Sequence, residues 1–148
     1  MSDPDPEDAR TSALYRRLID AADLDSFIES CAEELELPPF HAYITGLCRE
    51  RGLVPEQVIK KSGIERTYGH QLFNGTRRPS RDKAIQLAFG LELDLEGAQI
   101  LLQIAGKNPL YPRIKRDAAI LYCLHNRKDF QETQSVLYRL GLTLLGCR

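Results

Sequence analysis

The chain has 148 residues, of which 43% are hydrophobic and 28% are charged, and its formal net charge is −1. This is the composition of an ordinary globular protein with a core of its own, and it excludes fibrous and disordered classes. No apolar run reaches the roughly 20 residues of a membrane-spanning helix, and the acidic start MSDPDPEDAR is unlike a signal peptide. We therefore expect a cytoplasmic protein with no membrane partner.

Glycine, proline and short polar residues divide nearly the whole chain into helices, so we predict an all-α fold. No alternating strand pattern, internal repeat or low-complexity tract is apparent. We expect disorder from the start to about Arg10, followed by short helices. Pro38-Pro39 then separates this arm, residues 1–37, from the rest of the chain.

The next segment carries clear signals for helix ends. A helix from Phe40 is expected to end at Gly52 as a left-handed cap, and Pro55 suits the first position of a second helix. A third helix is expected over residues 65–73, because Asn74-Gly75 stops it.

Capping residues also mark the helices of the last part. Ser80 is expected to cap a fourth helix and Asp94 a fifth, which ends at Gly106. The loop KNPLYPR that follows contains two prolines and is expected to be irregular.

Two more helices are expected after this loop. Residues 118–124, AAILYCL, are apolar at all seven positions, which predicts a central, buried helix. Asp129 and Glu132 have the spacing of a capping box for a last helix through Leu140.

The four cysteines give no sign of a metal site. Zinc ligands usually occur in closely spaced pairs, whereas here no CxxC pair exists. Cys123 and His125 would point about 200° apart on a helix. We predict no metal and no cofactor, and we interpret the cysteines as reduced core residues: Cys31, Cys48, Cys123 and Cys147.

Charge is distributed unevenly along the chain. Residues 1–37 carry a net charge of −8, residues 49–83 of +5, and residues 84–148 of +2. The positive segment coincides with the second and third helices of the 38–106 region, where a partner of negative charge would bind.

Two short helices joined by a turn, with basic residues around the second, are typical of a helix-turn-helix. The run from Ile44 to about Leu91 resembles the Cro/lambda-repressor type, the XRE class of bacterial and phage regulators. The residues that carry this resemblance are Gly63-Ile64 in the turn, Gln71-Leu72-Phe73-Asn74-Gly75 at the helix end, Arg78-Pro79-Ser80, and the spaced Ile85, Leu87, Ala88 and Leu91.

The resemblance implies a domain organisation and a function. It implies a lambda-repressor-like helix-turn-helix bundle over residues 38–106, preceded by the acidic arm. Residues 107–148 would then form a C-terminal helical extension, which packs on the bundle or forms a dimer. The function implied is that of a sequence-specific DNA-binding transcriptional regulator, with recognition helix 65–73 in the major groove of double-stranded DNA.

The same resemblance assigns candidate DNA contacts. Arg66, Thr67 and Gln71 fall where such regulators read bases, and Arg and Gln suit guanine and adenine edges, respectively. His70 lies on the same side, and Gln57 matches a region that contacts the DNA backbone. The residues expected on phosphates are Asn74, Arg77, Arg78 and Arg81.

Three residues depart from the family pattern or need another explanation. Gly69 stands where a branched apolar residue is usual, and Ile59 stands where a small one is usual. Both predict an altered crossing of the two helices. Tyr68 is expected in the core, where its ring would compensate for Gly69.

Several interpretations stay open from the sequence. The arginines after residue 76 contact phosphates or solvate a helix start. Tyr111 with Arg113, Lys115 and Arg116 is a nucleic-acid patch or part of a rigid connector. The acidic arm either covers the positive face or packs as an ordinary arm with a solvated acidic side.

The alternatives for function differ in class. A protein-interaction adaptor that keeps the helix-turn-helix without binding DNA is the main alternative. No nucleophile elbow, P-loop or HExxH motif is present, so we do not expect an enzyme. For a DNA-binding module of this size we expect a homodimer, and a protein partner would use the acidic arm or the C-terminal helices.

Overall fold

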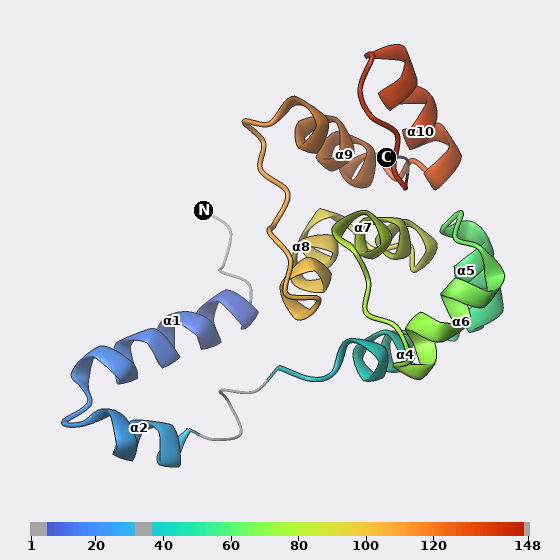
Figure 1. Cartoon of the computed structure of the whole chain (residues 1–148). Helices are drawn as coiled ribbons and strands as arrows, with labels where there is room; N and C mark the ends of the chain where they lie inside the picture. Colours follow the sequence, from blue (N-terminus) through green and yellow to red (C-terminus); the bar gives the residue numbers. More distant parts are fainter. Residues whose placement is uncertain (1–5, 32–36, 147–148) are drawn as a thin grey trace. The chain divides into compact units, whose positions relative to one another are not determined.

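The computed structural model describes residues 6–31 and 37–146, and every regular element within these ranges is an α-helix (Figure 1). The prediction of an all-α fold is confirmed. The chain divides into two compact units, Met1–Leu37 and Pro38–Arg148. Within the described ranges, no helix has both the length and the hydropathy needed to cross a membrane.

The first unit contains α1 (Pro6–Asp20) and α2 (Leu24–Ser30). Since α1 begins at Pro6, the expected disorder up to Arg10 is wrong for residues 6–10; residues 1–5 lie outside the described ranges. Asp23 caps α2, because its carboxylate accepts a hydrogen bond from the Ser26 amide at 2.8 Å.

The second unit starts with α4 (Phe40–Arg51), α5 (Pro55–Lys61) and α6 (Arg66–Asn74). Gly52 ends α4 with φ 66° and Pro55 opens α5, as predicted. Glu65 is the N-cap of α6, so this helix lies one residue later than the range 65–73.

Four more helices complete this unit: α7 (Arg81–Gly90), α8 (Leu95–Ile104), α9 (Lys115–His125) and α10 (Phe130–Arg139). The caps predicted at Ser80, Asp94 and Asp129 are confirmed, and Glu132 completes a capping box with Asp129. The loop between α8 and α9 has no regular structure, also as predicted.

Helix α7 is the central element of the second unit. Its residues from Ala84 to Gly90 are all buried, and the helix contacts α5, α8 and α10. The largest side chains of the core come from all seven helices of this unit, α4 to α10, and include Ile44, Val58, Leu72, Ile85, Leu101, Ile120 and Leu137. This core continues from α4 to α10, so residues 107–146 belong to the same compact unit as the preceding helices.

The predicted burial is confirmed for the described cysteines but only in part for the apolar segment 118–124. Cys31, Cys48 and Cys123 are free and buried, as predicted, while Cys147 lies outside the described ranges. In segment 118–124, however, Tyr122 is 63% exposed. The prediction that this helix is buried all round is therefore wrong on one face.

The second half of this unit contains an internal repeat, contrary to the expectation of none. Arg81 binds Asp117 with 2.8 Å between Nη2 and Oδ2, and Arg116 binds Asp82 with 3.0 Å between the same atoms. Arg116-Asp117 stands 35 positions after Arg81-Asp82. The two ion pairs are thus crossed: each arginine of one copy binds the aspartate of the other.

Further contacts recur with the same shift. Arg81 also donates to the carbonyls of Asn108 and Pro109, and Arg116 donates to those 35 positions later. The Gln99 amide pairs with the backbone of Leu110, as Gln134 does with Leu145. Glu92 and Arg127, also 35 apart, are the non-glycine residues with positive φ among those described. Hence α7–α8 and α9–α10, each with its following tail, are two copies of one helical unit.

Candidate nucleic-acid interface

The turn between α5 and α6 is held from both sides. Gly63 has φ 67°, a conformation that suits glycine. The Phe130 ring, on the first residue of α10, occupies the space that a Cβ at Gly63 would need. Ser62, fully buried in the same turn, donates its hydroxyl to the Val58 carbonyl at 2.6 Å. The α5–α6 turn therefore depends on the C-terminal repeat for its support.

Ile59 and Gly69 meet where α5 crosses α6. The Ile59 side chain, 2% exposed, lies directly against the Gly69 backbone, and a methyl group added at Gly69 would overlap with it. Compared with the family pattern, the large residue thus stands on α5 and the small one on α6. Ile59, rather than the Tyr68 ring, fills the space beside Gly69, and the two departures from the family pattern compensate for each other.

Helix α6 exposes polar side chains over its first two turns. The Glu65 carboxylate accepts hydrogen bonds from the Thr67 and Tyr68 amides, each at 2.9 Å, and these hold the pKa of Glu65 below its ordinary value. Arg66 and Thr67 are exposed in the first turn. His70 and Gln71 are half-buried one turn later, and helical spacing puts them on the same face.

Glu56, near the start of α5, binds two of these side chains. Its carboxylate oxygens lie 2.6 Å from Arg66 Nε and 2.6 Å from His70 Nε2. The hydrogen bond from Arg66, and after it that from His70, hold the pKa of the Glu56 carboxyl below its ordinary value. Glu56 was not among the residues predicted for the site, although it stands in the first turn of α5 next to Gln57, which is exposed.

A second group lies at the end of α6 around Tyr68. Arg77 lies over the Tyr68 ring at 4.6 Å from its centroid and donates from Nε to Gln71 Oε1 at 3.0 Å. Lys83 of α7 lies 5.5 Å from the same centroid. Tyr68 is half-buried and packs against the core while its ring holds two cations.

The remaining predicted contacts follow this group along the chain. Asn74 accepts a hydrogen bond from the Thr76 amide at 2.8 Å, which shapes the turn after α6. Arg78 is exposed, and among the described residues it has no hydrogen-bond or ion-pair partner.

The guanidinium of Arg81 donates its hydrogen bonds within the repeat. Its guanidinium binds Asp117, which is 2% exposed, and the carbonyls of Asn108 and Pro109. Burial raises the pKa of Asp117, but the hydrogen bonds from Arg81 and from the Tyr111 amide outweigh it and the pKa is lowered. Arg81 therefore connects α7 to the loop before α9, and we leave it out of the interface.

The basic loop 107–116 is organised by the same pairs. Arg116 is bound to Asp82 and to two carbonyls of the tail after α10. Tyr111, Arg113 and Lys115 are exposed. This geometry agrees with the rigid connector, because the loop is fixed at both ends by an arginine–aspartate pair.

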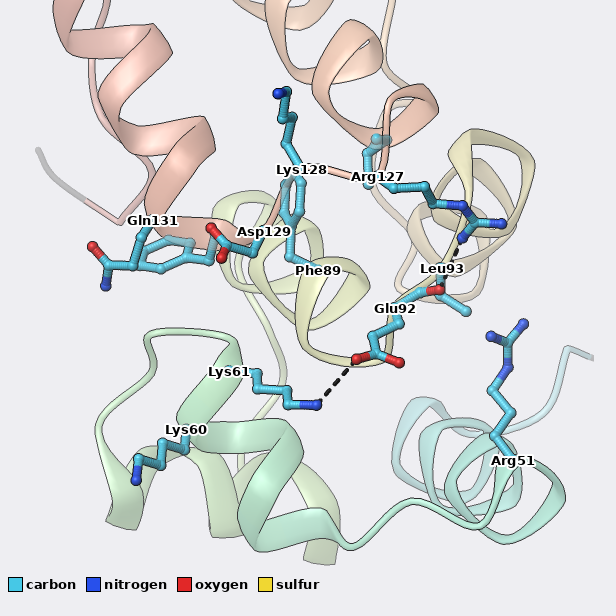
Figure 2. Close-up of a pocket in the computed structure, with 12 residues that line it drawn as sticks. Arg51, Lys60, Lys61, Phe89, Glu92, Leu93, Arg127, Lys128, Asp129 and Gln131 are labelled. Carbon is cyan, nitrogen blue, oxygen red and sulfur yellow. Dashed lines mark hydrogen bonds and ion pairs between the residues drawn. The ribbon is translucent and has the colours of Figure 1, made fainter.

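Part of the positive charge of segment 49–83 lies elsewhere, around a groove of about 650 Å³ (Figure 2). In Figure 2, Lys61 and Glu92 point toward each other, with 3.0 Å between Nζ and Oε1. Helices α4 and α5 end at this groove, and cations at helix C-termini complement the helix dipole. The cationic side chains around it are Arg51, Lys60, Lys61, Arg127 and Lys128.

Comparison with known proteins adds no relative: no family model, no curated protein and no solved structure matches the chain. The interface therefore stands on its own geometry. Among the described residues, no group of three or more His, Cys, Asp or Glu side chains is placed to hold a metal ion.

Proposed function

We propose that the chain is a sequence-specific DNA-binding regulator that inserts α6 into the major groove, with α5–α6 as a lambda-repressor-like helix-turn-helix. The observation that carries the proposal is the exposed polar face at the start of α6, with Arg66, Thr67, His70 and Gln71. Such donors at the N-terminal turns of a helix suit base edges. Asn74, Arg77 and Arg78 lie at the C-terminal end of α6 and in the loop after it and supply phosphate contacts, and Gln57 supplies another from α5.

The supported helix pair also favours this function. A recognition helix reads bases only when its position on the protein is fixed. Here Ile59 packs on Gly69 across the helix crossing, and Phe130 closes the turn at Gly63. Both contacts are apolar, and the side chains of Ile59 and Phe130 that make them are buried, so the polar face of α6 is held by a well-packed frame.

A protein-interaction adaptor is the alternative, and one observation favours it. Glu56 binds Arg66 and His70, so two of the expected base readers are already paired within the protein. Selection of bound sequences from a random duplex pool separates the two functions. Enrichment of a palindromic motif supports the regulator, and failure to bind any duplex at low salt supports the adaptor.

Replacing Arg66 and Arg78 in turn tests the division between base and phosphate contacts. With the selected duplex, Arg66→Ala is expected to lose about 1–3 kcal/mol of discrimination at one base pair, because a bidentate contact disappears. Arg78→Ala is expected to weaken binding to all duplexes and to reduce the salt slope by about 1. Titrations of matched and mismatched duplexes at several salt concentrations measure both effects. Equal losses of specificity in the two variants would contradict the assignment.

Replacing Glu56 with glutamine is expected to strengthen DNA binding. The change removes a negative charge close to the phosphates and releases Arg66 and His70 from their pairing. We expect binding to any duplex at low salt to tighten roughly 2- to 5-fold. Fluorescence anisotropy with a labelled duplex gives the affinity. Glu96→Gln, in the first turn of α8, is the matched control for the change in net charge and is expected to have a much smaller effect.

A further inference from the structure

The outward face of α9 lacks a cover that its sequence calls for. Segment 118–124 is apolar at every position, and a helix that is apolar all round is normally buried all round. In the described part of the chain, Tyr122 is nevertheless 63% exposed, and Ile114 and Tyr111 before it are 51% and 50% exposed. Ile114, the N-cap of α9, is followed at intervals of four residues by Ala118 and Tyr122 on one side of the helix, and Tyr111 lies in the loop before it.

The internal repeat shows what covers the equivalent face of α7. On α7, Lys83 lies over Tyr68 of α6, and Gln86 donates to the Ser62 carbonyl at 3.1 Å. Gly90 of the same face lies against Val58 and Ser62 of α5. The α5–α6 pair therefore packs on this face, and Leu87 within it is fully buried.

The corresponding positions of α9 have no such pair of helices on them. Shifted by 35 residues, Lys83, Gln86, Leu87 and Gly90 become Ala118, Leu121, Tyr122 and His125. Leu87 is fully buried, whereas Tyr122 is mostly exposed. The second copy of the unit thus keeps an apolar helix-binding face without a helix bound to it.

We propose that a second copy of this chain covers this face, with the two α9 helices packed antiparallel about a twofold axis near Ala118. Such a contact is isologous, since the same residues contribute from both sides. Ala118 at the centre lets the helix backbones approach closely. Lys115 then lies beside Tyr122 of the partner subunit, which forms two equivalent cation–π contacts.

The chemistry of the face fits this occupant. The described side chains along it carry cations and aromatic rings but no free carboxylate, because Asp117 is bound to Arg81. In the antiparallel arrangement each cation can lie on an aromatic ring of the other copy, a contact that the protein already uses where Lys83 and Arg77 lie on Tyr68. A strongly acidic partner could bind the cations but would not cover the exposed apolar surface of Tyr122 and Ile114.

Sedimentation velocity of the full chain without DNA tests the proposal. Over about 1–100 µM, we expect a monomer–dimer equilibrium. Tyr122→Ala is expected to raise the dimer dissociation constant at least about 10-fold, because it removes the aromatic ring from both cation–π contacts and much of the apolar area of the face. Tyr138→Ala is the matched control, since Tyr138 is 79% exposed on α10, and it is expected to leave the equilibrium unchanged.

A cross-link tests the antiparallel geometry. Ala118→Cys is expected to form a disulfide between the two copies under mild oxidation. The unchanged chain, which has no cysteine at this position, is the control. Circular dichroism shows that each variant is folded. A monomeric unchanged chain at 100 µM, or equal effects of the two tyrosine variants, overturns the proposal. The measurements contain no DNA, so they are independent of the proposed DNA binding.

Discussion

Replacing Asp117 with asparagine is expected to lower the free energy of unfolding by about 3–5 kcal/mol. Asp117 is 2% exposed and accepts hydrogen bonds from the Arg81 guanidinium and from the Tyr111 amide. Asparagine is uncharged, so the partly buried Arg81 loses its counter-charge. The asparagine NH2 group would also take the place of one carboxylate oxygen and face a donor, with which it cannot form a hydrogen bond. Urea denaturation followed by circular dichroism measures the loss.

Asp82→Asn is the matched control within the same repeat. It removes the equivalent carboxylate from Arg116, but the side chains of this pair are 25% and 20% exposed. Because water replaces part of the lost interaction, the loss should be clearly smaller than for Asp117→Asn. Equal losses would show that burial does not decide the strength of these pairs.

The two aspartates also predict how stability depends on pH. Burial raises the pKa of each, but the hydrogen bonds from arginine and from a backbone amide outweigh it, so both are lowered in the folded protein. The unfolded chain, with pKa values of about 3.9, therefore binds more protons in acid. The stabilisation by the two aspartates is complete above about pH 3.9. It is lost as the pH falls through the lower pKa values that they have in the folded protein. Below pH 4 or so, the stability of Asp117→Asn should fall less steeply than that of the unchanged chain.

Introducing valine at Gly69 is expected to destabilise the protein by about 3 kcal/mol or more, which combines overpacking with a branched residue in α6. The added carbons would occupy the space of the Ile59 side chain, which is 2% exposed. Thermal and urea denaturation measure the effect. DNA binding should fall with it, because α6 would be displaced from α5.

The compensating variant makes this test specific. Ile59→Ala alone should cost about 2–5 kcal/mol through the cavity that it leaves. Combined with Gly69→Val, it restores a large residue opposite a small one, so the double variant should be more stable than the sum of the single losses predicts. Strict additivity would mean that the two residues do not act as a pair.

The local features of this fold could be predicted from sequence because each depends on a few neighbouring residues. Gly52, Pro55, Ser80, Asp94 and Asp129 mark helix ends by backbone geometry or by a hydrogen bond within one turn. The contact of Ile59 with Gly69 could not be predicted in the same way. The sequence shows two unusual residues, but only the crossing of the helices shows that they touch.

The candidate interface was predictable in its residue types and less so in their pairing. An arginine looks the same in sequence whether it contacts a phosphate or a buried aspartate. Arg81 binds Asp117, 36 positions later, and Arg66 binds Glu56 in the preceding helix. Which partner each arginine binds depends on how the helices pack. The net charge of a segment gives no information about that packing.

The repeat had a sequence signal that the apolar pattern hid. The helices of the two copies differ at most apolar positions, as where Leu87 corresponds to Tyr122. The polar residues that the copies share are an Arg-Asp pair at the first helix, the aspartate that caps the second helix and a glutamine within it. A few apolar positions are also identical, among them Ile85 and Ile120. A search for polar residues at a fixed separation finds them, whereas hydrophobic periodicity does not.

The crossed arginine–aspartate pairs have a consequence for folding. Each arginine holds the tail of its own copy but takes its counter-charge from the other copy. Neither hairpin can therefore satisfy its polar groups alone, and opening one exposes a charge in both. The last four helices should gain and lose structure as one cooperative unit. Because Phe130 of this unit closes the turn at Gly63, the α5–α6 pair inherits that cooperativity, and its order depends on residues more than sixty positions away.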